Sequence, residues 1–357
     1  MKHIALYLGI AAALAASCDK TPVQDDTDPV VAFEDETFKA YCLSNFDKDG
    51  DGEISLEEAK EVKSIVLKKT IPFIPSITSL SGIGSFTNLV HLDCSYNMLT
   101  SLDLSQNTAL EYLDCSCNPL TGLNVGKNTA LTRLYCYSTQ LTSLDVSNNK
   151  ALEFMDCGDD LLTVLDISNN TALVYLRCSG NELTSLDISH NTALTTLYCE
   201  YNQLTSLKAD GVTSLEALYC NHNQLTGLDV SDNAALRWLY CYTNQLASLN
   251  VSGCTSLEWL YCHENRLTRI DVSNFPTLRE LLCGINQLTS LDVSGCTKME
   301  TIVCNDNRLT VLDVSGCPGL SGMECQNNPT LSEIWLKSGQ TIPYLVYDES
   351  IATIKYI

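Results

Sequence analysis

Six oxygen-bearing residues stand at close, mostly alternating positions in one short segment of this chain. They are Asp47, Asp49, Asp51, Glu53, Ser55 and Glu58. Calcium takes roughly six to eight oxygen ligands, and a loop of about twelve residues presents them by wrapping around the ion. Gly52 allows the sharp turn that such a loop makes. The spacing therefore predicts a calcium site to which Glu53 contributes its carbonyl oxygen, Ser55 a direct or water-mediated contact, and Glu58 both carboxylate oxygens.

Two helical segments are expected to position this loop. Phe38, Cys42 and Phe46 recur at helical spacing before it. The apolar residues at helical spacing after it are Ala59, Val62, Ile65 and Val66. The arrangement resembles an EF-hand over residues 36–68, and that resemblance implies calcium as the bound cofactor.

The EF-hand resemblance leaves Ile54 without its usual partner. EF-hands pair through this loop position, but no second loop occurs in the sequence. We expect Ile54 to rest on the region that follows or on a second molecule, and calcium to stabilise a cap rather than to operate a sensor. A dockerin-like protein, which binds cohesin, would need a duplicated loop and is a minor alternative.

A second chemically notable set is a column of cysteines spaced 21 residues apart. Its members are Cys94, Cys115, Cys136, Cys157, Cys178, Cys199, Cys220, Cys241, Cys262, Cys283, Cys304 and Cys325. A constant short period indicates a solenoid, in which each coil buries its apolar face against the next. Around each cysteine runs the pattern LxxLxCxxNxL, as at residues 89–99, and LxxLxLxxNxxL follows, as at residues 99–110.

These alternating half-repeats resemble the bacterial leucine-rich repeat proteins of the nested 21-residue kind (IRREKO). The resemblance implies a leucine-rich repeat solenoid of about 12 coils, with parallel β-strands on the concave face and short strands opposite, and with binding as its role. In LxC the leucine and the cysteine point inward, while the residue between them faces out. The expected organisation is a signal peptide (1–17), a lipidated disordered tether (18–35), the EF-hand (36–68), an N-terminal cap half-coil (69–88), the solenoid (89–336) and a C-terminal cap (337–357).

The ladder cysteines are expected to pack as small apolar groups. Neighbouring coils place their Cβ atoms about 5 Å apart with parallel side chains, which suits neither a disulfide nor a tetrahedral zinc site. Cys254, Cys296 and Cys317 stand in the second-half turns, and their spacing does not say whether they pair.

An asparagine column from Asn97 to Asn328 is expected to bond the turn backbone. Thr139 and Asp160 interrupt this column in adjacent coils, so we expect the loosest turns there. On the opposite strands an aspartate column runs from Asp103 to Asp313. Its carboxylates are expected to bond neighbouring turn groups rather than to bind further calcium.

The first residues resemble a bacterial lipoprotein signal. Lys2 precedes the apolar run 4–16, and residues 15–18 (AASC) resemble a lipobox with alanine where leucine is favoured. The resemblance implies cleavage before Cys18, lipidation of Cys18 and membrane attachment through that lipid. Because an acidic segment follows, we expect an exported outer membrane lipoprotein displayed at the surface; a plain signal peptide with a soluble product is the alternative.

An aromatic stripe occupies outward positions beside the ladder and is the candidate ligand-binding face. Its residues are Tyr135, Phe154, Tyr175, Tyr198, Tyr219, Trp238, Tyr240, Trp259 and Tyr261, with His222 and His263 beside them. Aromatic anchors dominate binding hot spots, although aromatic neighbours on adjacent strands also stabilise a sheet by about 0.2–1 kcal/mol per pair. We favour a protein ligand, with a polysaccharide bound by the same rings as the alternative.

Charge and motif content narrow the function further. The net charge of −22 argues against a nucleic-acid partner. The sequence contains no serine–histidine–acid grouping, phosphate-binding glycine loop or zinc-binding helix motif, so we expect no catalytic residue and no enzyme. A glycosidase-type pair of carboxylates on neighbouring coils is the weakest alternative.

Overall fold

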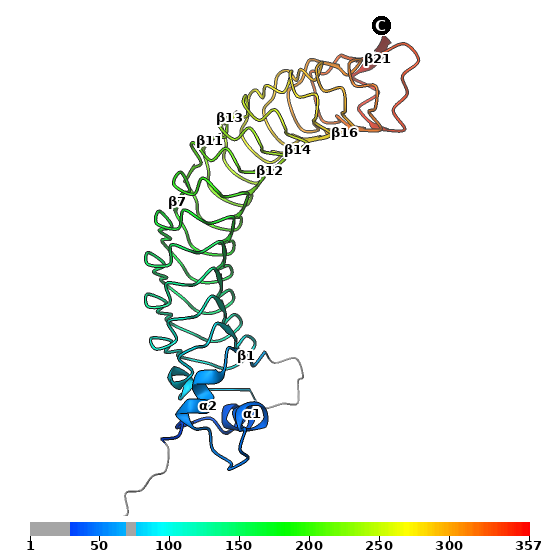
Figure 1. Cartoon of the computed structure of the whole chain (residues 1–357). Helices are drawn as coiled ribbons and strands as arrows, with labels where there is room; N and C mark the ends of the chain where they lie inside the picture. Colours follow the sequence, from blue (N-terminus) through cyan, green and yellow to red (C-terminus); the bar gives the residue numbers. More distant parts are fainter. Residues whose placement is uncertain (1–28, 69–75) are drawn as a thin grey trace, which may run out of the picture.

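The computed structural model describes residues 29–68 and 76–357 and is a curved solenoid with a small helical module at its N-terminal end (Figure 1). The predicted signal peptide and Cys18 lie outside these residues. No helix in the described ranges has the length and apolar character needed to cross a membrane.

One long parallel sheet of 14 strands lines the inner side of the curve (Figure 1). Its strands are β1 (Ser64–Val66), β2 (His91–Asp93), β3 (Tyr112–Asp114), β4 (Arg133–Tyr135), β5 (Phe154–Asp156), β6 (Tyr175–Arg177), β8 (Thr196–Tyr198), β10 (Ala217–Tyr219), β12 (Trp238–Tyr240), β14 (Trp259–Tyr261), β15 (Glu280–Leu282), β16 (Thr301–Val303), β18 (Gly322–Glu324) and β20 (Tyr344–Val346). In this register Leu218 pairs with Leu197 on one side and Leu239 on the other, so equivalent residues of successive repeats stack. The predicted leucine-rich repeat solenoid is confirmed.

The outer side of the curve carries short strand groups separated by turns (Figure 1). These are β7 (Ser185–Asp187) with β9 (Ser206–Lys208), β11 (Gly227–Asp229) with β13 (Ser248–Asn250), and β17 (Val311–Asp313) with β19 (Glu333–Leu336) and β21 (Thr353–Tyr356). The strands β20 and β21 join the two sides as a further coil, whereas the sequence had suggested that residues 337–357 fold over the last coil as a cap.

Leucine and cysteine fill the interior of the solenoid. Leu218, Cys220 and their equivalents are fully buried, and every described cysteine is a free thiol. Burial raises the pKa of Cys220 to about 12, so the thiol stays protonated at neutral pH. Cys254 does not form a disulfide either, because its Sγ donates to the Val230 carbonyl at 3.1 Å. The ladder therefore contributes apolar packing, as its spacing predicts.

The asparagine column closes each turn after the cysteine. Asn202, for example, donates to the carbonyls of Cys178 (3.0 Å) and Cys199 (3.2 Å) and accepts from the Leu183 amide (3.0 Å). Each side chain thus ties two coils together.

The turns at Thr139 and Asp160, which the sequence predicts to be the loosest of the column, keep part of its hydrogen bonding. Asp160 Oδ1 accepts from the Thr139 amide at 2.9 Å and lies 2.6 Å from the Thr139 hydroxyl, and it also accepts from the Leu141 amide at 3.3 Å. The last of these contacts is the one that asparagine makes elsewhere in the column. The turn therefore keeps the bond to the Leu141 amide, with a carboxylate oxygen in place of the amide oxygen.

The N-terminal module contains α1 (Glu36–Phe46) and the short α2 (Leu56–Glu61). A 3-10 turn η1 (Ile83–Ser85) lies near the start of the second described range. Helix α2 ends at Glu61, so the predicted helical face through Val62, Ile65 and Val66 is wrong. These residues instead lead into β1, where Ile65 pairs with Leu92. The β-branched pair Ile65 and Val66 suits an extended strand, and the free edge of β2 supplies its hydrogen bonds.

The predicted disordered tether is also wrong for its described part, residues 29–35. Val31 is 2% exposed, and Phe33 packs edge-on against Phe38 with ring centroids 5.3 Å apart. Asp35 then caps α1 by accepting from the amides of Thr37 and Phe38. The charge-rich composition did not reveal this order, because it depends on a few apolar residues that pack against the rest of the module.

Candidate functional site

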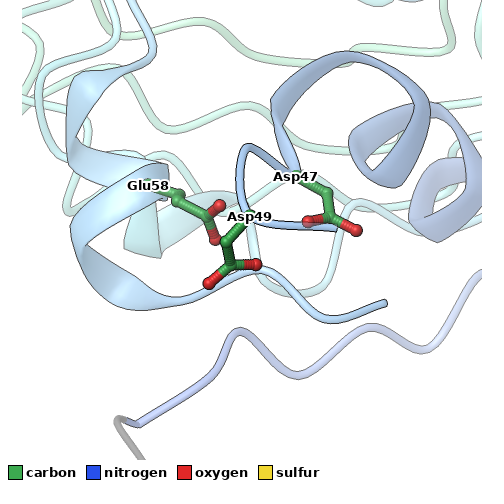
Figure 2. A group of neighbouring side chains, drawn as sticks. All are labelled: Asp47, Asp49 and Glu58. Atoms are coloured by element: carbon green, nitrogen blue, oxygen red, sulfur yellow. The ribbon is translucent and has the colours of Figure 1, made fainter. Parts of the chain in front are cut away.

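The loop between α1 and α2 brings three of the six predicted calcium ligands together. Carboxylate oxygens of Asp47, Asp49 and Glu58 lie within 4.8 Å of one another, and Figure 2 shows Glu58 on α2 beside the two aspartates of the loop. Within the described residues this is the only such cluster. Asp51, Glu53 and Ser55 are not part of it, although they follow in the same loop.

Backbone amides shape this loop around its carboxylates. Asp47 accepts from the amides of Gly50 (2.7 Å) and Gly52 (3.1 Å), both of which have positive φ. Asp51 Oδ1 accepts from the Glu53 amide at 2.8 Å. The chain therefore curls with its carboxylates inward, which suits a hard cation that prefers oxygen ligands.

Glu58 links the loop to the following helix. It forms a capping box with Ser55: Ser55 accepts from the Glu58 amide, and Glu58 Oε2 accepts from the Ser55 amide at 2.9 Å. Glu58 Oε1 also accepts from the Lys48 amide at 2.7 Å. These backbone amides, first that of Lys48, lower the pKa of Glu58 and keep it ionised. A bound cation would find a charged carboxylate already placed by α2.

Residues before α1 pair with the end of the loop between α1 and α2. The Val31 amide donates to the Ile54 carbonyl at 2.8 Å, and the Leu56 amide donates to the Pro29 carbonyl at 3.0 Å. Val30 and Ser55 form an antiparallel bridge, and the Ile54 side chain is fully buried. The unpaired loop strand is thus completed within the chain itself.

The N-terminal module is packed onto the first coil of the solenoid. Phe86 lies against Phe38 and Phe46, with ring centroids 6.4 Å and 6.1 Å apart. The Tyr41 hydroxyl accepts from the Val66 amide at 3.2 Å, at the edge of the long sheet. The module therefore covers the end of the core where the sheet would otherwise be open.

The predicted ligand-face residues occupy several neighbouring columns of the concave face. The first position of each strand holds Phe154, Tyr175, Trp238 and Trp259. The third position holds Tyr135, Tyr198, Tyr219, Tyr240 and Tyr261. His263 follows its ladder cysteine directly, whereas His222 is one residue further and has φ 53°. The structure brings eight of these side chains into one continuous patch, called here the aromatic patch. Its members are Tyr198, Tyr219, His222, Trp238, Tyr240, Trp259, Tyr261 and His263.

Rings in the aromatic patch stack on one another along the solenoid. Tyr198 and Tyr219 lie 4.5 Å apart at an interplanar angle of 5°, and Tyr240 and Tyr261 lie 4.3 Å apart at 10°. Trp238 and Trp259 are 5.3 Å apart at 4°. Within these three pairs the rings cover much of each other's faces, whereas Tyr219 and Tyr240 meet edge to face at an interplanar angle of 81°.

Imidazole rings extend the stacking toward the turns. His222 stacks on Tyr201 at 4.4 Å, and His263 stacks on Tyr242 at 4.5 Å. Burial lowers the pKa of His263, whose Nδ1 has no hydrogen-bond partner among the described residues. The patch is therefore a rigid surface of stacked rings with a neutral imidazole at its rim.

An alternating row of charges flanks the two tryptophans, and sequence reasoning missed it. The row runs Glu216, Arg237, Glu258, Arg279 and Glu300, one residue before each strand. Arg237 pairs with Glu258 and stacks on the Trp238 ring at 4.4 Å, while Arg279 pairs with both Glu258 and Glu300. The sequence could have predicted this row, because residues of alternating charge recur every 21 residues.

Sequence reasoning also missed a left-handed turn that recurs two residues after the cysteine. Tyr96, Tyr201, His222 and Ile285 all have φ between 53° and 59°. The signal is weak because only Gly180 among the equivalent positions is glycine. This backbone conformation is what carries Tyr201 and His222 to the rim of the patch.

The aspartate column on the outer side has a structural explanation, as predicted. Asp187 Oδ1, for example, accepts from the Ser189 amide at 2.9 Å and from the Ser189 hydroxyl at 2.6 Å. The Ser189 hydroxyl and amide lower the pKa of Asp187. Each aspartate thus closes its own turn, and the column offers no convergent cation site among the described residues.

Comparison with known proteins places this architecture. A sequence profile for leucine-rich repeats (2 copies) matches residues 87–127. No curated protein matches the chain. The functional domain of InlJ from Listeria monocytogenes, whose structure includes a cysteine ladder, is 31% identical with a TM-score of 0.69, and the match covers 90% of this chain and 70% of that one.

Two further structures share the fold at lower identity. The internalin InlF from Listeria monocytogenes is 24% identical with a TM-score of 0.60, over 82% of this chain and 95% of that one. The ectodomain of the plant receptor kinase GASSHO1/SCHENGEN3 from Arabidopsis thaliana, solved in complex with CASPARIAN STRIP INTEGRITY FACTOR 2, is 22% identical with a TM-score of 0.65, over 82% of this chain and 42% of that one. The chain belongs to the leucine-rich repeat proteins.

Proposed function

We propose that this chain is a protein-binding module that holds its ligand on the aromatic patch of the concave face. The observation that carries the proposal is the patch itself: Trp238, Trp259 and four tyrosines lie on neighbouring strands of a rigid sheet. Rings already held in place lose little conformational freedom on binding, and such anchors dominate protein interfaces. The complex of the plant ectodomain supports a binding role for this architecture by analogy.

The geometry of the rings weighs against a polysaccharide as the ligand. A sugar stacks on an open aromatic face, but Tyr198–Tyr219 and Tyr240–Tyr261 cover one another at 4.5 Å and 4.3 Å. The Arg237 guanidinium lies over the Trp238 ring, 4.4 Å from its centroid. Edges and hydroxyl groups remain, and these suit the mixed apolar and polar surface of a protein.

The ligand test uses tryptophan variants with a matched control. The double variant Trp238→Ala, Trp259→Ala should lose a protein partner that the wild type retains from extracellular fractions. Trp335→Ala removes the tryptophan of β19, on the opposite side, and should retain it. Equal recovery by all three proteins would place the binding site elsewhere, and tryptophan quenching by a glycan panel would favour the polysaccharide.

We further propose that calcium binds the loop at Asp47, Asp49 and Glu58, with Asp51, Glu53 and Ser55 completing the site. The cluster of three carboxylates and the inward curl of the loop support this. Calcium would hold α1 and α2 together beneath Phe86 and so stabilise the end of the solenoid. Its role is structural in this proposal.

Calcium binding is tested with Glu58→Gln, which keeps the capping box because glutamine serves at that position. Wild-type melting temperature should rise with calcium, by the linkage that gives about 2.7 kcal/mol at a hundredfold excess over the dissociation constant. Glu58→Gln should melt normally in chelator and gain little from calcium, whereas Glu57→Gln should behave as the wild type. Absence of binding heat with the wild type in calorimetry would refute the site.

Attachment to a membrane through lipid on Cys18, with display at the outer surface, is proposed from the sequence alone. Mass spectrometry of the N-terminal peptide from the native host should show a lipidated Cys18, and Cys18→Ala should abolish membrane fractionation. A mature protein cleaved at another residue would refute it.

A further inference from the structure

A hollow opens on the outer side of the solenoid, between β13 and the coil that follows it (Figure 1). Its volume is about 660 Å³, within the range of roughly 300–1,000 Å³ that ligand pockets occupy. Residues 247–252 and 269–271 line it. The strands β11 and β13 pair with each other, but residues 269–271 form no strand that would continue their sheet. The hollow therefore lies at the free edge of β13.

This free edge leaves a backbone donor unused. In the preceding coil the Val230 amide donates to the Asn250 carbonyl at 3.0 Å. The equivalent Val251 amide, which lines the hollow, has no acceptor among the described residues. Ser248 and Ser252 add hydroxyl groups on either side of it. A ligand that offers acceptor oxygens here would satisfy a group that the chain leaves unpaired.

Arg269 is the only cation among the residues that line the hollow. Its side chain is exposed, and the ion pairs of arginine among the described residues all involve Arg177, Arg237 or Arg279. Asp271 is the one carboxylate of the lining, and its Oδ1 accepts from the Ser273 amide at 3.2 Å. The guanidinium is thus available to an acceptor from outside the chain.

Two departures from the repeat make the charge of this hollow more positive. The positions equivalent to Arg269 hold serine, glycine or valine in the other coils between residues 101 and 311. In the neighbouring coil Asn250 stands where most coils have aspartate. A second outer hollow, which residues of three coils from 101 to 145 line, contains Asp103 and Asp145 and no cation. A cation at the outer side is therefore particular to the hollow at β13.

We propose that this hollow binds an acidic sugar whose carboxylate accepts a forked pair of hydrogen bonds from Arg269. Arginine suits a carboxylate because its planar group donates two parallel bonds. The ring hydroxyls would bond Ser248, Ser252 and the Val251 amide, and the apolar face of the ring would lie on the partly exposed Leu249. A uronate combines these features. The site lies on the side of the solenoid opposite the aromatic patch, so it adds a second ligand to the proposed protein partner.

The test is a titration of isotope-labelled protein with glucuronate and with galacturonate, followed by NMR at the Arg269 Nε–H group and the Leu249 methyl groups. Glucose and acetate are titrated in parallel, because each supplies one half of the ligand. A uronate should shift both sets of signals and bind roughly tenfold more tightly than glucose or acetate, as expected for hydrogen bonds to a charged group. The Leu123 methyl groups, in the hollow without a cation, should not shift.

Three variants assign the effect to Arg269. Arg269→Gln should weaken uronate binding roughly tenfold. Arg269→Lys should recover part of the loss, because an ammonium group keeps the charge without the fork. Arg266→Gln removes the same charge from an exposed position outside the lining and should bind as the wild type does. Uronate binding that is absent, that acetate matches, or that Arg269→Gln retains would overturn the proposal. Tighter binding of a capped glutamate peptide would assign the hollow to an acidic protein segment instead.

Discussion

Asp160 makes a specific prediction about stability and pH. It stands in the asparagine column, where its Oδ1 makes the contact to the Leu141 amide that an amide oxygen makes in other coils. Its Oδ2 then occupies the place of the amide nitrogen, which in Asn202 donates to the carbonyls of two ladder cysteines. A charged Oδ2 cannot donate, and it is buried without a partner. A protonated Oδ2 can replace the amide.

The sign and size of the effect of Asp160 on the free energy of unfolding follow from its pKa, which burial raises from 3.8 to about 6. Below about pH 4 the carboxyl is protonated in both the folded and the unfolded chain, so it adds no pH dependence to the free energy of unfolding. Between about pH 4 and 6 the unfolded chain loses its proton first, so stability falls as pH rises. The pKa shift of Asp160 corresponds to a loss of about 3 kcal/mol of stability above pH 6. Screening by nearby solvent reduces the expected loss to about 1–2 kcal/mol at pH 7.5.

Asp160→Asn should therefore stabilise the protein at pH 7.5 by about 1–2 kcal/mol and change it little at pH 4. Urea unfolding of wild type and variant at each pH gives the difference, with equal m-values required because repeat proteins can unfold in parts. Subtracting the wild type removes the opposite contribution of carboxylates such as Asp187, whose pKa is lowered. The reverse change Asn202→Asp should create the same pH-dependent loss. A stabilisation that does not vary with pH, or a destabilised Asp160→Asn at pH 7.5, would refute the argument.

Three other predictions follow from packing and backbone geometry. Leu218→Ala should cost about 2–5 kcal/mol in urea unfolding because Leu218 is fully buried, whereas Leu345→Ala, at a partly buried position in β20 at the end of the long sheet, should cost clearly less. Ile285→Asn should stabilise by about 1 kcal/mol, since a β-branched residue is strained at φ 53° and its side chain is 49% exposed; an unchanged or lower unfolding midpoint would contradict this. Among the described cysteines, Cys117 alone is not buried and should react first with iodoacetamide, which peptide mapping would show.

The inward pattern of the solenoid could be predicted from sequence because one residue type repeats without a slip. Leucine and cysteine two residues apart on a strand must share a face, and the constant period fixes every coil in the same register. The pairing of Leu218 with Leu197 and Leu239 follows directly. Repetition turns a weak local signal into a strong one.

The junction between the N-terminal module and the solenoid could not be predicted in the same way, because it occurs once. Ile65 fits a helical face when only its own segment is considered, yet the exposed edge of β2 offers a strand partner. Val31 likewise lies in a charge-rich segment, and its role depends on the unpaired Ile54 carbonyl. Tertiary hydrogen-bond partners decided both cases over local preference.

The aromatic patch was located from the sequence, but its chemistry required the structure. The spacing placed Tyr198, Tyr219, Trp238 and Trp259 on one face without showing that the rings stack on one another. Whether faces or edges point outward depends on side-chain rotamers, which a sequence pattern does not encode. The exposure of ring faces or ring edges is the property that bears on the choice between a polysaccharide and a protein as the proposed ligand.

The proposed calcium site and the aromatic patch should act as separate units, and this makes their tests independent. In a solenoid each coil contacts only its neighbours, so a change at one end is felt over a few coils. The N-terminal module contacts β1 and Phe86, whereas Trp238 and Trp259 lie on β12 and β14, several strands along the sheet. If calcium binds there as proposed, its removal should loosen the first coils, seen as faster amide exchange around β2, while binding of the protein partner at the patch persists. If chelation abolished binding at Trp238, the solenoid would have to transmit strain over many coils, and the nearest-neighbour account of its stability would fail.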